Sequence, residues 1–477
     1  MIRITFLFLE RMRQKYYDPS KLVFRRTTLV ALCRSVSLCL AATLAPILWQ
    51  PAIAQTLLRD AEIEEWLRDY SDPLIAAAGI EPSSINILLI GDPTLNAFAG
   101  GRIMGFHTGL LTQSQTPNEI EAVIAHEVGH IAGGHTARSD EVMAKASRPM
   151  LLSLVLAAGA AVAGAPEASI GLLGLGQNIG FAEVTKYSRG QEAAADQASL
   201  TYLEKTKRSG KGAIDIWNRM RNAQIIRGFK INPYRQTHPM AIERAAALQE
   251  RVEASPYYDV KDSPEDMHRL HMIQAKIIGF LETPQMALRQ YPESDTSEPA
   301  RYARAVAYYR DAQIDKALVE IDSLIEAHPD NQYFHELKGQ MLFEFGRVRD
   351  SIAPHRDSVE LDPDEALLRL NLGRALVSSE DPTQIENAIK ELRAAVLIEP
   401  DNAYAWFFLS RAYGFEGNLP MAHLATAESK YHGGAPGEAA VFAQRAIAGL
   451  SKGTPEYRQA ADIIQAAQNM RGRRRTR

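Results

Sequence analysis

A Pro-Asp motif that recurs in the second half of the chain constrains the fold more than any other feature. It occurs within His328–Asn331, Asp362–Asp364 and Pro400–Asn402, at intervals of 34 and then 37 residues. A period near 34 residues indicates two antiparallel helices per repeat, and the proline ends the second helix because it lacks the N–H that a helix needs. Repeats of this kind bury their apolar faces against one another, so this half is predicted to form an all-α solenoid.

The pattern within each period resembles the tetratricopeptide repeat (TPR). The fullest copy has Trp406 and Tyr413 at the expected spacing, and the copy before it has Gly373 where two helices must cross closely. We assign the TPR domain to residues 298–470. We predict a helical connector or capping repeat over 256–297, with a helical pattern in 266–292, and further capping helices over 436–469. Residues 471–477 are predicted to form a disordered basic tail.

The first 54 residues have the parts of an export signal. A basic stretch precedes the apolar run Thr27–Trp49, and Ala52–Ala54 offers small residues for cleavage before Gln55. These parts are typical of a secretory signal peptide over 1–54, and an uncleaved membrane anchor is the alternative. The leader holds eight of the 53 lysines and arginines, two of the 57 acidic residues and both cysteines, so its removal changes the net charge from −4 to −10. A mature chain without cysteine suits an oxidising compartment.

Composition narrows the classes of partner. Hydrophobic residues make up 46% of the chain and charged residues 23%, as in ordinary globular proteins. The net charge is small and gives no sign of the basic surface that binds nucleic acid, so we expect no nucleic-acid partner. Two apolar stretches, Met150–Ala165 and Ile170–Phe181, are each too short to span a bilayer. We expect a hairpin over 150–181 that either packs in the core or touches lipid or an unfolded protein.

A metal-binding motif lies on a helix whose start is well marked. Thr116 is a good N-cap, Pro117 suits the first helical position, and Glu119 completes a capping box. The motif His126–His130 reads H-E-V-G-H, which places two histidines one turn apart on the same helix face. On a helix, H-E-x-x-H binds zinc, and Glu127 is then the general base. The sequence therefore predicts a zinc hydrolase.

A catalytic zinc site needs a third protein ligand. His135 follows His130 by five residues, whereas the metzincin pattern requires six, so we expect His135 to be structural. Glu192 is the better candidate, because it begins an E-x-x-x-D pair with Asp196 on a predicted helix. Two carboxylates one turn apart repel each other unless a cation or a hydrogen-bond donor lies between them. We expect Glu192 to bind the metal and Asp196 to accept a histidine N–H.

The H-E-x-G-H motif, the later E-x-x-x-D pair and an upstream Asn-Ala-Phe together resemble family forty-eight of the metallopeptidases. The leader and the TPRs resemble its periplasmic BepA-like branch. This resemblance implies zinc ligands, a general base, a carboxylate that supports the ligands, and an edge strand that binds substrate. It also implies a Thr-His-Pro element whose histidine either plugs the zinc or helps catalysis. The resemblance implies that His126, His130 and Glu192 are the zinc ligands, that Glu127 is the general base and that Asp196 is the supporting carboxylate. It also implies that Asn96, Ala97 and Phe98 belong to the substrate-binding edge strand, and that His238 and Arg244 belong to the Thr-His-Pro element.

We therefore expect an α+β, zincin-like peptidase domain over 55–255, mainly helical with a small β-sheet. Ile85–Ile90 is predicted as a buried strand and Arg102–Leu111 as a further strand or hairpin. The resemblance implies a periplasmic zinc endopeptidase, with one zinc per chain, that degrades misfolded or stalled outer-membrane proteins. Its TPRs would recruit substrate or the outer-membrane assembly machinery. The alternatives are a TPR chaperone or adaptor with a largely latent protease site, and another zinc hydrolase such as a deformylase.

Overall fold

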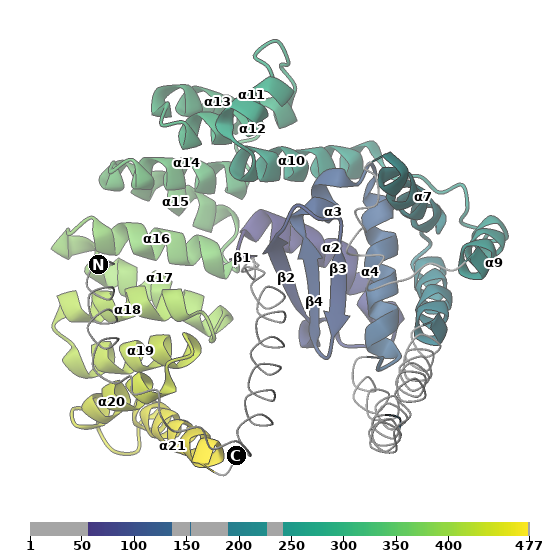
Figure 1. Cartoon of the computed structure of the whole chain (residues 1–477). Helices are drawn as coiled ribbons and strands as arrows, with labels where there is room; N and C mark the ends of the chain where they lie inside the picture. The colour runs from purple at the N-terminus through teal and green to yellow at the C-terminus, as the bar shows by residue number, and fades with distance from the viewer. Residues whose placement is uncertain (1–55, 136–152, 154–188, 227–241, 476–477) are drawn as a thin grey trace, which may run out of the picture. The chain divides into compact units, whose positions relative to one another are not determined.

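The computed structural model describes residues 56–135, 153, 189–226 and 242–475 (Figure 1). The predicted leader, His238 and all of the predicted hairpin over 150–181 except Ser153 lie outside these residues. Residues 56–477 form one unit by their internal contacts. In the described part of the chain, no helix is both long and apolar enough to cross a membrane.

A small sheet of four strands forms the β part, in the order β1-β2-β4-β3. β2 pairs parallel with β4, while β1 and β3 run antiparallel to their neighbours at the two edges. Phe98 of β3 lies opposite Gly105 of β4, where any side chain would collide with the Phe98 ring. The strands are β1 (Thr56–Leu58), β2 (Asn86–Gly91), β3 (Ala97–Gly100) and β4 (Ile103–His107).

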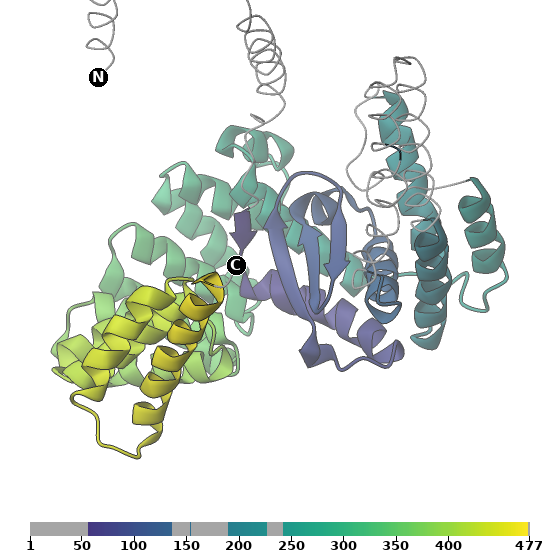
Figure 2. The ribbon, with the colours of Figure 1, turned by 60° about the horizontal axis from the view of Figure 1, so that its bottom comes forward.

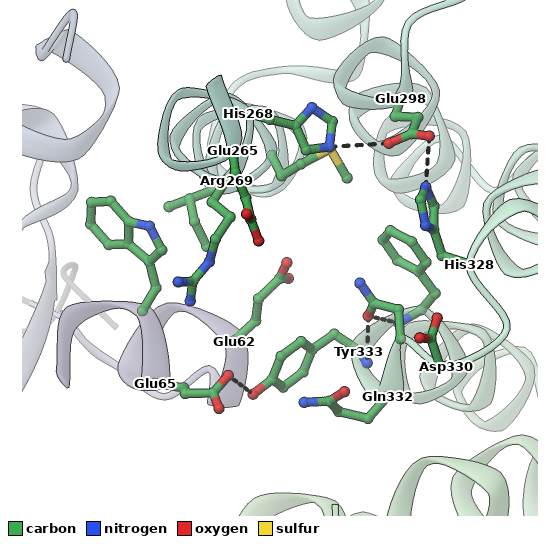
Figure 3. Close-up of a pocket in the computed structure, with 15 residues that line it drawn as sticks. Glu62, Glu65, Glu265, His268, Arg269, Glu298, His328, Asp330, Gln332 and Tyr333 are labelled. Atoms are coloured by element: carbon green, nitrogen blue, oxygen red, sulfur yellow. Dashed lines mark hydrogen bonds and ion pairs between the residues drawn. The ribbon is translucent and has the colours of Figure 1, made fainter. Parts of the chain in front are cut away.

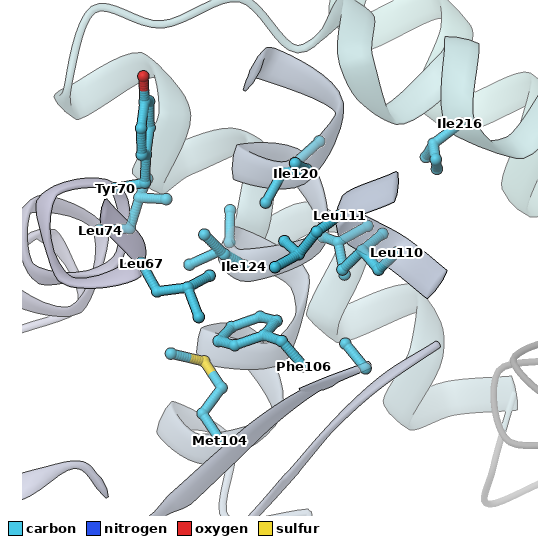
Figure 4. Packing of buried hydrophobic residues seen from close by; sticks show 14 of the residues in the cluster. Leu67, Tyr70, Leu74, Met104, Phe106, Leu110, Leu111, Ile120, Ile124 and Ile216 are labelled. Atoms are coloured by element: carbon cyan, nitrogen blue, oxygen red, sulfur yellow. The ribbon is translucent and has the colours of Figure 1, made fainter. Parts of the chain in front are cut away.

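Helices pack against this sheet and enclose the peptidase core. Figure 2 shows α2 lying across the strands, and Figure 4 shows Phe106 and Met104 of the sheet meeting Leu67 and Ile124 of the helices. All four side chains are buried, so the sheet and helices share one hydrophobic core. These helices are α2 (Ala61–Ala77), α3 (Thr108–Gln113), α4 (Pro117–Ala132), a helix over 189–205, α7 (Lys211–Ile226) and α9 (Ile242–Glu253).

The second half consists of helix hairpins that stack in chain order (Figures 1 and 2). Gly339 and Gly373, 34 residues apart, mark the close crossings. A side chain at either would collide with the ring of His355 or with Leu392 on the second helix of the hairpin. The pairs are α12 (Glu298–Arg310) with α13 (Ile314–Ala327), α14 (Gln332–Glu344) with α15 (Val348–Leu361), α16 (Ala366–Ser378) with α17 (Ile385–Ile398), α18 (Ala403–Glu416) with α19 (Leu419–His432), and α20 (Pro436–Ile447) with α21 (Pro455–Arg475).

The helical connector predicted before the repeats belongs to both halves. It comprises α10 (Pro264–Leu281) and α11 (Pro284–Gln290). Leu270 and Ile273 of α10 lie in the peptidase core, while Met272 and Ala275 lie in the core of the first repeats. The peptidase part and the repeat part therefore meet across one shared helix. The exact domain boundaries remain predictions.

One local expectation is correct only in part, and another is wrong. The strand expected over Arg102–Leu111 is present as β4 up to His107, but its last residues belong to α3. α3 packs against α10, and Gln274 donates to the carbonyl of Leu111 at 2.9 Å. The basic tail was expected to be disordered, but α21 continues to Arg475.

Candidate active site

The helix α4 carries the histidine motif into the core. Thr116 Oγ1 accepts from the Glu119 N–H at 3.3 Å, so Thr116 caps the helix as predicted. The Glu119 carboxylate accepts from the N–H of Gln115 at 2.8 Å, one residue before the position that the predicted capping box uses. Every residue from Ile120 to His130 is buried. A buried polar side chain is costly unless it has partners. The motif therefore requires partners from elsewhere in the fold.

Those partners come from the helix over 189–205. Glu192 and Asp196 are 2% and 3% exposed, and both carboxylates contact His126. Asp196 Oδ1 lies 3.1 Å from His126 Nδ1, and Glu192 Oε2 lies 3.4 Å from His126 Nε2. Burial alone would lower the pKa of His126, but these two carboxylates outweigh it and raise that pKa to about 10. The two acids that the sequence placed on one face thus surround one imidazole.

Three side chains converge on a single point. The two Nε2 atoms of His126 and His130 are 3.1 Å apart, and Glu192 Oε1 lies 3.4 Å from His130 Nε2. One donor atom from each of the three residues lies within 4.8 Å of the others. Two imidazole nitrogens and a carboxylate oxygen are a ligand set used by catalytic zinc, which leaves a fourth position for water or substrate. The predicted ligands are brought together, and their chemistry fits a zinc ion.

The remaining acid of the motif is also in place. Glu127 follows His126 on α4 and is 1% exposed, in the buried stretch beside the convergent ligands. A carboxylate here can act as a base toward a water held by a metal. The roles of Glu127 as general base and of Asp196 as support for His126 remain predictions.

His135 touches the cluster, which the sequence reasoning missed. Its Nδ1 lies 2.9 Å from Nδ1 of His130, and the two rings are nearly perpendicular at 79°. The sequence alone predicts a structural role for this residue. The spacing of five residues gave no sign of the contact, because the chain reverses at Gly134, which has a positive φ of 61°.

The predicted substrate strand lies at the edge of the sheet. Ala97 and Phe98 belong to β3, and Asn96 precedes it, accepting from the His107 N–H at 3.1 Å through its carbonyl. Among the described residues, β3 pairs with β4 alone, which places it at one edge of the described sheet. α4 packs against β3, which places this edge beside the helix of the cluster.

Two predicted residues stay without a described position. His238 lies outside the described residues, and Arg244 lies within α9, where only the backbone is described. The two roles named for His238, zinc plug and catalytic helper, both stay predictions.

A separate pocket lies away from this cluster. It has a volume of about 360 Å³ and lies between α2, α10 and the repeat helices (Figure 3). Glu298 links His268 and His328 there, at 3.0 and 2.7 Å. None of the convergent ligands lines it, so we place the candidate active site at the histidine cluster.

Comparison with known proteins agrees with the site. Residues 61–252 match the model described as peptidase family M48. A beta-barrel assembly-enhancing protease of Yersinia pestis is 24% identical over 387 residues, which cover 78% of this chain and 76% of the relative. The protein of that name from Escherichia coli K12 is 20% identical over 386 residues, with the same coverage. The metalloprotease LoiP of Escherichia coli K12 is 30% identical over 175 residues, which cover 36% of this chain and 64% of LoiP.

Proposed function

We propose that this chain, a metallopeptidase whose residues 61–252 form a family M48 domain, uses zinc to cut unfolded segments of outer-membrane proteins in the periplasm. The observation that carries the proposal is the convergence of His126, His130 and Glu192 within 4.8 Å, on the helix that also carries Glu127. The names of the relatives, which are beta-barrel assembly-enhancing proteases, support the substrate class. The apolar leader over 1–54 and the absence of cysteine after it support the compartment.

The chain's own residues would divide the work of hydrolysis. His126, His130 and Glu192 would hold the zinc, which, when bound, polarises the scissile carbonyl and makes its water acidic enough to react near pH 7. Glu127 would take the proton of the attacking water and pass it to the leaving amine. Asp196 would keep the His126 ring in place through its contact with Nδ1.

The edge strand β3 supports a preference for unfolded segments. A peptide bound along an edge strand such as β3 must be extended, because strand addition pairs backbone with backbone. A compact folded domain does not present such a segment. Peptidase action would therefore be confined to stalled, misfolded or unassembled chains.

The repeats would recruit these chains or the outer-membrane assembly machinery. α18 exposes Tyr404, Phe407 and Phe415, which are 49%, 45% and 54% accessible and recur along one helix face. This exposed aromatic face also supports the second candidate function, a TPR chaperone or adaptor with a largely latent protease site.

The variant Glu127→Gln tests the proposal and separates the two candidates. The substrate is one outer-membrane β-barrel protein, offered unfolded in buffer and folded in detergent. We expect cleavage of the unfolded form only, and a loss of about 100-fold or more with Glu127→Gln. The control is Glu326→Gln, the same change at an exposed position of α13. A Glu127→Gln chain that restores every defect of a deletion strain would instead identify the adaptor. Purified protein with far less than one zinc per chain would contradict the metal assignment.

A further inference from the structure

We propose that His135 is a positioning residue that fixes the ring and the tautomer of the metal ligand His130. The inference rests on the proposed function, since it takes the cluster to be a metal site. It assigns to His130 the kind of support that Asp196 gives to His126. In proteins, the second ring N–H of a metal-bound histidine characteristically donates a hydrogen bond to an acceptor outside the metal site.

The two ring nitrogens of His130 face in different directions. Its Nε2 faces His126 and Glu192, at 3.1 and 3.4 Å, while its Nδ1 faces His135 Nδ1 at 2.9 Å. An imidazole that binds a metal through Nε2 carries its proton on Nδ1. That N–H must then donate, and His135 Nδ1 must accept. The geometry thus assigns His135 the tautomer with its proton on Nε2.

The chain holds His135 by contacts from both metal-bearing helices. Its backbone N–H donates to the His130 carbonyl at 3.1 Å, and its carbonyl accepts from Gln191 Nε2 at 3.0 Å. Gln191 is the neighbour of Glu192, so this bond ties the end of α4 to the start of the second helix. The His135 ring also lies over Gly133, where a Cβ atom would come within 2.3 Å of its Nε2. These contacts hold the backbone of His135 in place, and its ring lies between Gly133 and His130.

A neutral partner has a consequence for the charge of the site. Glu127, Glu192 and Asp196 already bring three buried carboxylates to the neighbourhood of one divalent ion. An aspartate in place of His135 would add a fourth negative charge, which burial makes costly. An imidazole supplies the same acceptor without that charge.

The test compares two variants of nearly the same shape in the purified full chain. Asparagine places an acceptor oxygen near the position of Nδ1, whereas leucine offers none. The zinc affinity of wild type, His135→Asn and His135→Leu is measured by competition with a chelator. We expect His135→Leu to bind zinc roughly 10- to 100-fold more weakly, and His135→Asn to stay within about threefold of wild type. Equal losses in both variants, or no loss in either, would overturn the proposal.

A measurement on the wild-type chain keeps the inference testable if His135→Leu does not fold. Nitrogen-15 NMR of the histidine rings in the zinc-loaded protein reports which nitrogen carries the proton. We expect protons on Nδ1 of His130 and on Nε2 of His135, and a proton on Nδ1 of His135 would refute the assignment. A wild-type chain that binds no zinc would overturn the proposed function itself. Zinc binding together with the wrong tautomer would overturn only the role of His135.

Discussion

Gly129 lies directly against the backbone of Ala195. A Cβ atom at position 129 would come within 2.9 Å of the Ala195 carbonyl oxygen and 3.0 Å of its Cα. Gly129 stands beside His130 on α4, and Ala195 stands between Glu192 and Asp196 on the second helix. The two helices that carry the metal ligands therefore meet where an added side chain would collide with backbone, and we expect the spacing of the ligands to depend on that contact.

The variant Gly129→Ala should push these two helices apart. The added methyl meets backbone and not a flexible side chain, so the helices must shift by several tenths of an ångström. We expect zinc binding at least about tenfold weaker, as when an outer partner of a metal ligand is lost, and a matching loss of peptidase rate. Chelator competition measures the effect. The control is Gly414→Ala on α18, where the methyl enters open space and helix propensity rises by about 1 kcal/mol. Unchanged zinc affinity in Gly129→Ala would show that the crossing does not set the ligand spacing.

Removal of the Asp196 carboxylate should weaken the site through His126. Asp196→Ala deletes the acceptor that lies 3.1 Å from His126 Nδ1, and we expect zinc affinity to fall about 10- to 100-fold. Asp196→Asn keeps an oxygen that can accept the N–H, so its loss should be smaller. Isothermal titration with zinc would rank the two. Asp401→Ala, at an exposed position, should bind like wild type. A ranking in which asparagine is as damaging as alanine would indicate that the charge matters and the hydrogen bond does not.

Lys276 of α10 carries a buried charge where the two halves meet. It is 2% exposed, and its Nζ lies 2.8 Å from Asp60 and 3.0 Å from Glu62, which hold its pKa well above the ordinary range despite burial. Lys276→Met would leave these carboxylates without their cation, at a cost of about 3–5 kcal/mol in the free energy of unfolding. Urea unfolding measures the loss. Lys390→Met removes a lysine whose side chain is 77% exposed, and should change stability by less than about 0.5 kcal/mol. Similar small losses in both chains would contradict the buried network.

His355 should make the repeats sensitive to acid. It is fully buried on α15, and burial, with the Arg374 charge nearby, lowers its pKa to about 3. The folded chain keeps this ring neutral, whereas the unfolded chain binds a proton below about pH 6.5. Stability from this residue is therefore complete above pH 6.5 and is lost as the pH falls toward 3.

The variant His355→Leu should remove that part of the pH dependence. Between pH 7.5 and pH 5, wild type should lose about 2 kcal/mol more unfolding free energy than the variant. A change in packing alters the free energy of unfolding equally at both pH values. The difference between the two pH values is therefore independent of packing. Parallel losses in the two chains would assign the acid sensitivity to other residues. Urea unfolding of both chains at the two pH values gives the comparison.

Local signals predicted the parts of the fold that depend on neighbours in the chain. Thr116 and Pro117 predicted the start of α4, and the 34-residue period predicted helix hairpins with glycine at the crossings. The four-residue spacings predicted which histidines and acids share a face. The structure then showed that those two faces meet. In each case the physical cause lies within one or two helical turns.

Features that depend on distant contacts could not be predicted. α3 replaces only the last part of the expected strand, because Gln274, 163 residues away from Leu111, donates to the carbonyls of Leu111 and Ser114. His135 reaches His130 only because Gly134 reverses the chain and Gln191 holds the returning segment. Neither contact leaves a periodic trace in the sequence, since each joins residues whose spacing has no helical or strand repeat.

The shared helix α10 would set the distance between a polypeptide bound to the repeats and the metal ligands. Leu270 and Met272 belong to different cores, so within the described residues a packed helix, and not an exposed linker, joins the peptidase part to the repeats. A polypeptide gripped by the repeats would meet the metal at a fixed distance along its own length. The cleaved bond would then lie at a fixed number of residues from the segment bound to the repeats. If residues are inserted between that segment and the cleaved bond, the substrate should be cut at the same number of residues from the bound segment, and so at a different sequence.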